Sequence, residues 1–541
     1  MLILIAKVVL VLVFVATAYI LSGIVYRHYK RSLAFLRGPP KTSLLFGLDY
    51  ELQLQEEFNG LESQWYKEYG TAYRGSTYYG EDMLMVSDPK ALLYICNASG
   101  YRFPKPQDVR HITQYLMGSG ITTVEDQVHN RQRKVLNPAF SAKQLRQFLE
   151  LFQSSTKRLA AKWQQECDTS KGAVLNVCKW LPRITLDVIG ESAFSYEFGS
   201  LKGEENELGV IFEHLFVDSR VNPGKWRLLY RSLRGNLPDF VGNFLVRFPS
   251  KEERRFLGFL NASKRVARPL FKRASDGTAE KDTKDSKDVL SILVQANQQM
   301  DPKKALDEDE VLSQMAVMIL AGHETTASTF TLLMHQLAKN PKDQERLYQE
   351  IQEVRERIGE QDPSPQDLDS MPFFNAVIKE ILRLYPIVPT LIRQARSDDA
   401  IPLEFPVTTV SGDVISSIPV SKGQRVTLHL AMYNRLPQVW GGDADQWNPE
   451  RFLDTKKRTS LGVYANLMSF SSGLRGCIGW RFAVMELQAI LFGLLEKFEF
   501  SPPSSGELDE IQLLPFGLIT PLRKGKWHEG KQLPIFVKSR N

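Results

Sequence analysis

The chain has 541 residues, of which 43% are hydrophobic and 24% are charged, an ordinary balance for a folded globular protein. Its net charge of +6 does not suggest nucleic-acid binding, although it suits a protein that lies on an anionic membrane surface or docks an acidic partner. The four cysteines include no C-x-x-C pair, which argues against zinc, iron–sulfur clusters and covalently attached c-type haem.

The N-terminal segment predicts a membrane anchor. Residues 8–26 carry no charge and approach the ~20 residues that span a bilayer as a helix. A cleaved signal peptide with its cleavage site at residues 16–18 is the alternative. The apolar run continues past that site, however, and exceeds the roughly 7–15 residues of a signal.

Basic residues directly after the apolar run predict the topology. Such residues stay on the cytoplasmic side of a membrane; here they are Arg27, Lys30 and Arg31. We therefore expect a single-pass anchor at residues 1–26, a basic, proline-rich linker at 27–43 and one cytoplasmic domain at 44–541.

Helical periodicity dominates that domain, which predicts a mainly α fold with small β-sheets. Helices are expected at residues 143–163, 311–338, 342–358, 374–384 and 480–494, and short strands at 72–74, 83–86 and 426–429. Residues 274–288 are rich in charge and poor in apolar side chains, which predicts a solvated loop.

The ten residues 470–479, FSSGLRGCIG, are the sharpest signal in the chain. They resemble the F-x-x-G-x-R-x-C-x-G loop of the cytochrome P450 superfamily, with Phe470, Gly473, Arg475, Cys477 and Gly479 at its fixed positions. The resemblance implies a haem b cofactor whose iron takes Cys477 as axial ligand and a propionate held by Arg475. Gly473 and Gly479 are expected to allow tight turns and close approach to the flat macrocycle.

The helix predicted after Cys477 favours its thiolate form, because helix N-termini attract negative charge. Two other interpretations of this cysteine are open. A buried cysteine in a glycine-rich turn is the simplest one, but the complete pattern argues against it. For a catalytic nucleophile, no partner histidine is identifiable from the sequence.

Two further segments match the same family in the right order. Glu380 and Arg383 form its E-x-x-R pair, and the spacing of three places both on one helix face. Arg451, in a P-E-R-F segment, completes a structural triad that is expected to fix the loop of Cys477.

The acid–hydroxyl pair Glu324–Thr325 lies within the long apolar helix. By resemblance, Thr325 supports oxygen activation, Glu324 relays protons, and the helix opens slightly beside them. The alternative is a buried threonine that bonds its own helix backbone. His323 is interpreted as a packing or polar-contact residue.

Weaker matches extend the resemblance to other cofactor contacts. Arg133, His129 and Arg393 are expected near the haem propionates, although His129 stands where the family usually has tryptophan. By analogy, a largely apolar substrate pocket is lined by residues 104–121, 212–221, 315–325, 388–392 and 516–519, which fits a lipophilic small molecule.

The resemblance implies a monooxygenase that inserts one atom of O2 into a lipophilic substrate, such as a terpenoid or other secondary metabolite. The H-x-R-x-R-K and P-A-F segments are most like eukaryotic microsomal, particularly fungal, members, which implies the endoplasmic reticulum membrane. No G-x-G-x-x-G fingerprint is present, so electrons are expected from NADPH–cytochrome P450 reductase, with cytochrome b5 as a second donor. Alternatives are a haem-thiolate isomerase or dehydratase, which commonly lacks the Glu324–Thr325 pair, and a non-catalytic haem-binding protein.

Overall fold

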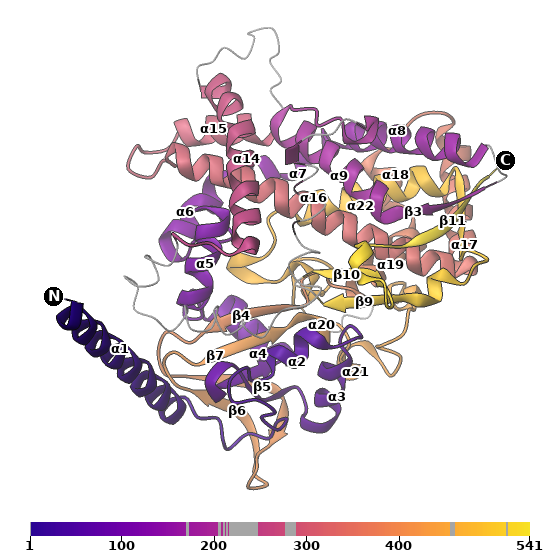
Figure 1. The fold of residues 1–541 in the computed structure, drawn as a ribbon. Coiled ribbons are helices and arrows are strands. Elements are labelled where there is room, and N and C mark those ends of the chain that lie inside the picture. The colour runs from indigo at the N-terminus through magenta and orange to yellow at the C-terminus, as the bar shows by residue number, and fades with distance from the viewer. Residues whose placement is uncertain are drawn as a thin grey trace.

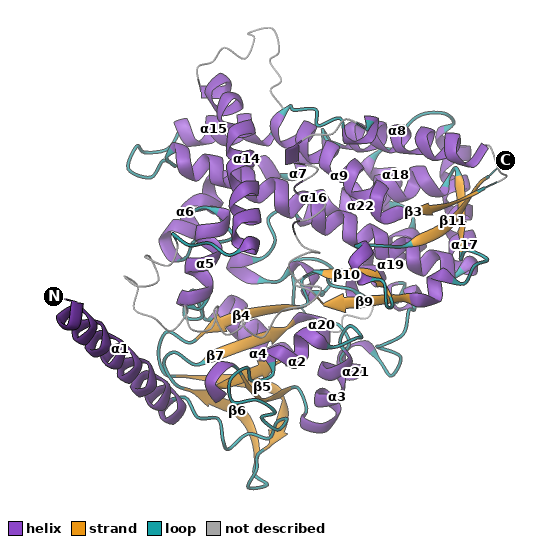
Figure 2. Ribbon diagram, in the orientation of Figure 1, coloured by secondary structure: helices purple, strands orange, loops and turns teal. Residues whose placement is uncertain are grey.

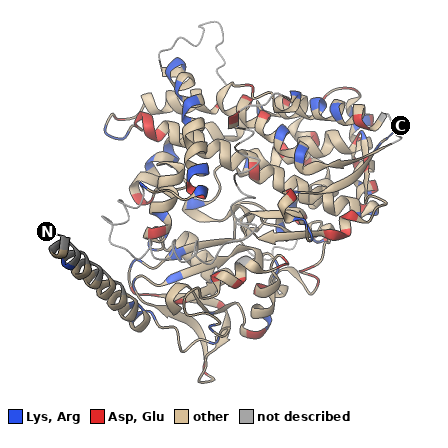
Figure 3. Cartoon of the chain, viewed as in Figure 1, with Lys and Arg blue, Asp and Glu red and all other residues tan. Residues whose placement is uncertain are grey.

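The computed structural model describes residues 2–168, 172–203, 207–208, 211, 215, 247–275, 288–454, 460–515 and 518–540. Helices make up one side of the molecule and most of the sheet structure lies on the other (Figures 1 and 2), so the predicted mainly α fold with small sheets is confirmed. Acidic and basic residues are interspersed along the chain (Figure 3).

The first half of the chain contributes nine of the described helices, of which the first projects from the rest (Figure 1). They are α1 (Leu2–Lys30), α2 (Asp49–Leu54), α3 (Gly60–Tyr69), α4 (Pro89–Leu93), α5 (Gln107–Met117), α6 (Asp126–Leu136), α7 (Ala142–Arg146), α8 (Leu149–Asp168) and α9 (Val177–Phe194).

The second half supplies the long central helix and its neighbours. They are α14 (Lys251–Ser275), α15 (Val289–Gln298), α16 (Glu308–Lys339), α17 (Pro341–Ile358), α18 (Pro365–Asp369), α19 (Pro372–Leu384), α20 (Leu430–Tyr433), α21 (Pro437–Trp440) and α22 (Trp480–Leu495).

The strands form four small sheets in the described part of the chain. One has the order β1-β2-β7-β4 and another the order β3-β11-β8, while β5–β6 and β9–β10 are antiparallel pairs. Their bounds are β1 (Ala72–Ser76), β2 (Asp82–Val86), β3 (Ala173–Asn176), β4 (Thr390–Gln394), β5 (Asp399–Thr408), β6 (Val414–Val420), β7 (Arg425–His429), β8 (Phe498–Ser501), β9 (Ile511–Pro515), β10 (Ile519–Arg523) and β11 (Pro534–Ser539).

Helix α16 is the axis of the core. Its N-terminus is fixed by a capping box in which Asp307 and Glu310 exchange side-chain and backbone hydrogen bonds. Helices α9, α14, α19 and α22 all pack against it. The predicted helix at 143–163 is wrong in one respect: the chain forms α7 and α8 there, separated by a turn at 147–148. The other predicted helices and strands are present.

Helix α1 leads away from the rest of the chain (Figure 1), and Arg31 at its end pairs with Glu81 at 2.6 Å. Among the residues that the structure describes, none of the helices combines the length and apolarity needed to cross a bilayer. The anchor, the linker and the domain boundaries therefore stay predictions. The loop expected at 274–288 falls mostly on residues 276–287, outside the described residues.

Candidate active site

The cysteine loop is closed by its own backbone and held by a neighbouring turn. The Cys477 N–H donates to the Phe470 carbonyl at 2.8 Å, and the Ser472 hydroxyl donates to Asn97 Oδ1 at 2.9 Å. Gly473 has φ +67°, and a Cβ there would lie 2.0 Å from the Cys96 carbonyl oxygen. Only glycine fits this position.

The expectation for the two loop glycines needs correcting. The close approach at Gly473 is to the backbone of the turn η2 (Tyr94–Ala98), which comes from the other half of the chain. Gly479 has φ −91°, which any residue adopts, and its nearest contact would be Phe140 at 3.7 Å. The tight turn therefore requires glycine at Gly473 and not at Gly479.

Cys477 lies in a hollow of the protein. Its side chain is exposed, in contrast to buried Cys167 and half-buried Cys96 and Cys178. Burial among surrounding atoms nevertheless raises the pKa of the Cys477 thiol, and the Gly479 N–H and the Arg133 charge offset this only in part. The net direction is upward, against the lowering expected from the N-terminus of α22.

The central helix presents one open stripe within an otherwise buried surface. Between positions 310 and 338, every residue of α16 is buried except Met318, Ala321, Gly322 and Thr325. Their spacing of i, i+3, i+4 and i+7 places them on one helix face. A buried helix with a single accessible, mostly apolar stripe is what a wall of an internal binding cavity requires.

The acid and the hydroxyl predicted to act together take different partners. The Thr325 hydroxyl donates to the Ala321 carbonyl at 2.7 Å, and α16 runs unbroken from Glu308 to Lys339. The helix is continuous here, and the Thr325 hydroxyl makes an i−4 bond of the kind that often bends a helix. The slight opening implied by the resemblance stays a prediction. Glu324 is 3% exposed and forms an ion pair with Lys531.

His323 supports that buried pair. Its Nδ1 lies 3.7 Å from Glu324 Oε2. Burial first, and then the Lys531 charge, lower the pKa of His323 to about 3, so the ring is neutral near pH 7. His323 is buried, and its packing or polar-contact role stays a prediction.

The predicted triad is confirmed. Arg383 Nε donates to Glu380 Oε2 at 2.7 Å and Arg451 Nε to Glu380 Oε1 at 3.2 Å, with all three buried. Arg383 also donates to the Asn434 carbonyl at 2.7 Å, and Asn434 Oδ1 accepts the Met468 N–H at 3.0 Å. The triad thereby fixes the chain that leads into the cysteine loop.

Three arginines that the sequence predicts near the haem propionates lie beside the cysteine loop. Arg133 donates to the Gly476 carbonyl at 2.6 Å. Arg393 is 6% exposed and shares the lining of a small cavity with Arg475. Arg475 is paired with Glu125.

Comparison with known proteins agrees with this geometry. The family model described as Cytochrome P450 matches residues 37–528. The chain belongs to the cytochrome P450 family. It is similar to Cytochrome P450 monooxygenase 128 of Postia placenta, with 32% identity over 532 residues, covering 96% of this chain and 95% of the relative. It is also similar to Cytochrome P450 monooxygenase claO of Ampulloclitocybe clavipes, with 31% identity over 538 residues, covering 98% and 97%.

The residues of this P450 fit thiolate-ligated haem b, the cofactor of the family. Cys477 offers an accessible thiol in a hollow. Arg393 is buried, and Arg133 and Arg475 are half-buried; of these three, Arg475 is paired with Glu125, and charges removed from water require partners of opposite sign. Two propionate carboxylates would supply them. Haem-dependent monooxygenation is therefore the activity of this chain.

Unlike the arginines beside it, His129 is neutral near pH 7. Burial first, and then the charges of Lys105, Arg133 and Arg393, lower its pKa to about 4. Its Nδ1 is hydrogen-bonded to the Tyr101 hydroxyl at 2.9 Å. The neutral ring is thus tied to Tyr101, and a charged contact from His129 to a propionate is not supported.

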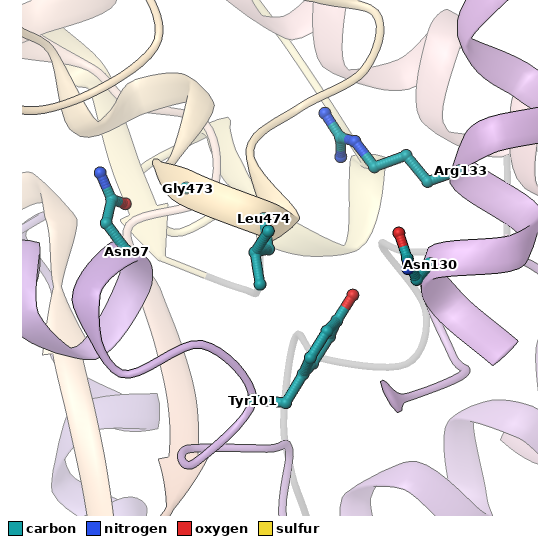
Figure 4. A pocket seen from close by; sticks show the side chains of 6 residues that line it. All are labelled: Asn97, Tyr101, Asn130, Arg133, Gly473 and Leu474. Carbon is teal, nitrogen blue, oxygen red and sulfur yellow. The ribbon is translucent and has the colours of Figure 1, made fainter. Parts of the chain in front are cut away.

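A cavity of about 370 Å³ opens beside the cysteine loop. Figure 4 shows Arg133 and Asn130 projecting from α6 toward Tyr101 and Leu474, with Asn97 opposite them. Tyr101 and Asn130 are not predicted as site residues from the sequence, because a lone phenol or amide carries no motif, and Asn97 is recognisable there only as part of a glycosylation sequon.

The predicted substrate pocket is only partly within the described chain. Helix α5, in the expected segment 104–121, has no fully buried residue, and Met318 and Leu391 are half-buried. Most of segment 212–221, and residues 516–517, lie outside the described residues.

Proposed function

We propose that this P450 oxidises a lipophilic small molecule, of terpenoid or similar apolar character, as part of secondary metabolism. The observation that carries the proposal is the open stripe of α16, where Met318, Ala321 and Gly322 offer apolar contact beside Thr325. An apolar wall with one hydroxyl favours a ligand held by burial of its surface and oriented by few polar groups.

The acid–hydroxyl pair favours oxygen insertion over isomerisation or dehydration. Bound haem supplies a thiolate-ligated iron that activates dioxygen. Thr325 then places a hydroxyl on the open face. Glu324, which is paired with Lys531, supplies a carboxylate on the residue directly before Thr325. The Lys531 side chain is itself 20% exposed. The pair gives a route by which protons pass from the exterior toward Thr325.

Electrons are proposed to come from NADPH–cytochrome P450 reductase, with cytochrome b5 as a second donor, on the endoplasmic reticulum membrane. Product analysis tests the function: membranes carrying this chain and a reductase are supplied with candidate terpenoids under 18O2. Products should carry one 18O atom each and require NADPH. A rearranged product without label would favour the isomerase or dehydratase alternative.

Topology is tested by glycosylation. Two sequons are present, at Asn97 and Asn261. Both asparagines are exposed, but the Asn97 side chain is hydrogen-bonded to Ser472 in the fold, so Asn261 on α14 is the informative site. A cytoplasmic domain leaves it unmodified, and a glycan on Asn261 would reverse the proposed orientation.

A further inference from the structure

One buried carboxylate lies among the cations behind the cysteine loop. Glu125, directly before α6, is 6% exposed. Its Oε1 accepts the Lys105 backbone N–H at 3.2 Å and lies 3.3 Å from Lys105 Nζ. Its other carboxylate oxygen accepts a hydrogen bond from the Arg475 guanidinium. Glu125 thus joins two segments that are 350 positions apart in sequence.

The surroundings of Glu125 are crowded with positive charge. Burial first, and then the charges of Arg475, Arg393 and Arg110, lower the pKa of Lys105 to about 6. Because removing one member of a buried pair leaves an uncompensated charge, Glu125 compensates the charge of the Arg475 guanidinium.

Arg475 is held from a second side as well. Its guanidinium lies over the Tyr101 ring, 4.9 Å from the centroid, a favourable cation–π arrangement. With Glu125 on one side and Tyr101 on another, the guanidinium has little freedom of orientation. A pre-positioned guanidinium loses less entropy when it binds a carboxylate.

The charge of Glu125 also affects the iron of a bound haem. Ferric haem carries one more positive charge than ferrous haem, so a nearby negative charge favours the ferric state. The environment of a haem, and not only its axial ligand, sets its reduction potential.

We propose that Glu125 is a positioning residue of the haem site, which fixes Arg475 for the haem propionates and whose negative charge lowers the reduction potential of the iron. This role is independent of the substrate, so it stands or falls separately from the proposed function.

The test is a potentiometric titration of the haem-loaded enzyme and its variants. Glu125→Gln keeps the shape of the side chain and removes the charge, whereas Glu125→Asp keeps the charge. We expect Glu125→Gln to shift the potential positively by up to about 59 mV, which is a tenfold change in the ferric-to-ferrous ratio for one electron. Glu125→Asp should stay close to the wild type.

Glu496→Gln is the matched control. It breaks another partly buried Glu–Arg pair, with Arg355, at the far end of α22, and should leave the potential unchanged. The red-shifted Soret band of the ferrous carbon monoxide complex reports intact thiolate ligation in every variant.

The outcomes separate a charge effect from packing. An unchanged potential in well-loaded Glu125→Gln, or equal shifts in both Glu125 variants, would overturn the proposal. If Glu125→Gln fails to retain haem while Glu125→Asp retains it, the charge is required and the proposal is supported. Loss of haem in both would show that Glu125 matters only for packing.

Discussion

Replacement of Thr325 by alanine should separate folding from oxygen chemistry. The change removes one hydroxyl, which bonds the Ala321 carbonyl at 2.7 Å. Such a bond contributes about 0.5–1.5 kcal/mol net, while alanine gains up to about 0.7 kcal/mol in helix propensity over threonine. The two effects largely cancel, so the free energy of unfolding should change by less than about 1 kcal/mol.

The chemistry should change far more than the stability. Groups that place protons typically contribute about 10²–10⁴-fold to rate. When a proton does not reach the correct oxygen atom, the reducing equivalents leave as hydrogen peroxide. We expect Thr325→Ala to bind haem and consume NADPH, yet to form several-fold less product per NADPH, with the difference recovered as peroxide.

The assay measures product, NADPH and peroxide in the same reaction. Thr331→Ala is the matched control, because Thr331 makes the same i−4 bond at 2.8 Å but is buried away from the open stripe. It should remain coupled like the wild type, and Thr325→Ser should recover most of the coupling. Wild-type coupling in Thr325→Ala, or equal uncoupling in Thr331→Ala, would refute the reasoning.

Three other substitutions test the frame around the site. Gly473→Ala should abolish the red-shifted carbon monoxide band, since its Cβ would clash with backbone. Gly203→Ala is the control, because Gly203 has φ +81° and no atom within 4 Å; it should lower the free energy of unfolding by only about 1–2 kcal/mol and keep the band. Burial raises the pKa of Glu486 from 4.5 to about 8. Between these pH values the folded state therefore holds a proton that the unfolded state releases. The free energy of unfolding of the wild type consequently decreases as the pH rises from 4.5 to about 8. Glu486→Gln lacks this loss, so its stability relative to the wild type, measured by thermal unfolding, should increase from pH 5 to pH 8; a constant difference would contradict the assigned pKa. Lys531→Met leaves the Glu324 carboxylate unpaired and should cost about 3–5 kcal/mol of unfolding free energy, most of it recovered in the double variant with Glu324→Gln; an additive loss would argue against the pair.

Local sequence alone determined the cysteine loop and the helices. The pattern around Cys477 is contiguous, so the glycine of the turn, the arginine and the thiol are recognisable as one motif. The apolar run of 311–338 predicted α16 because periodicity and length are properties of neighbouring residues. The Glu380–Arg383 pair was likewise accessible, since a spacing of three fixes both on one helix face.

Only the tertiary structure decided which distant charges meet and which protons they keep. Glu125 with Arg475, and Glu324 with Lys531, are separated by hundreds of residues, and isolated acids or lysines carry no motif that would pair them. The raised pKa of Cys477 and the neutral ring of His129 follow from burial, which disfavours charged forms by removing water. The sequence thus identifies the expected site residues, whereas long-range packing determines which residues they pair with and whether they are charged.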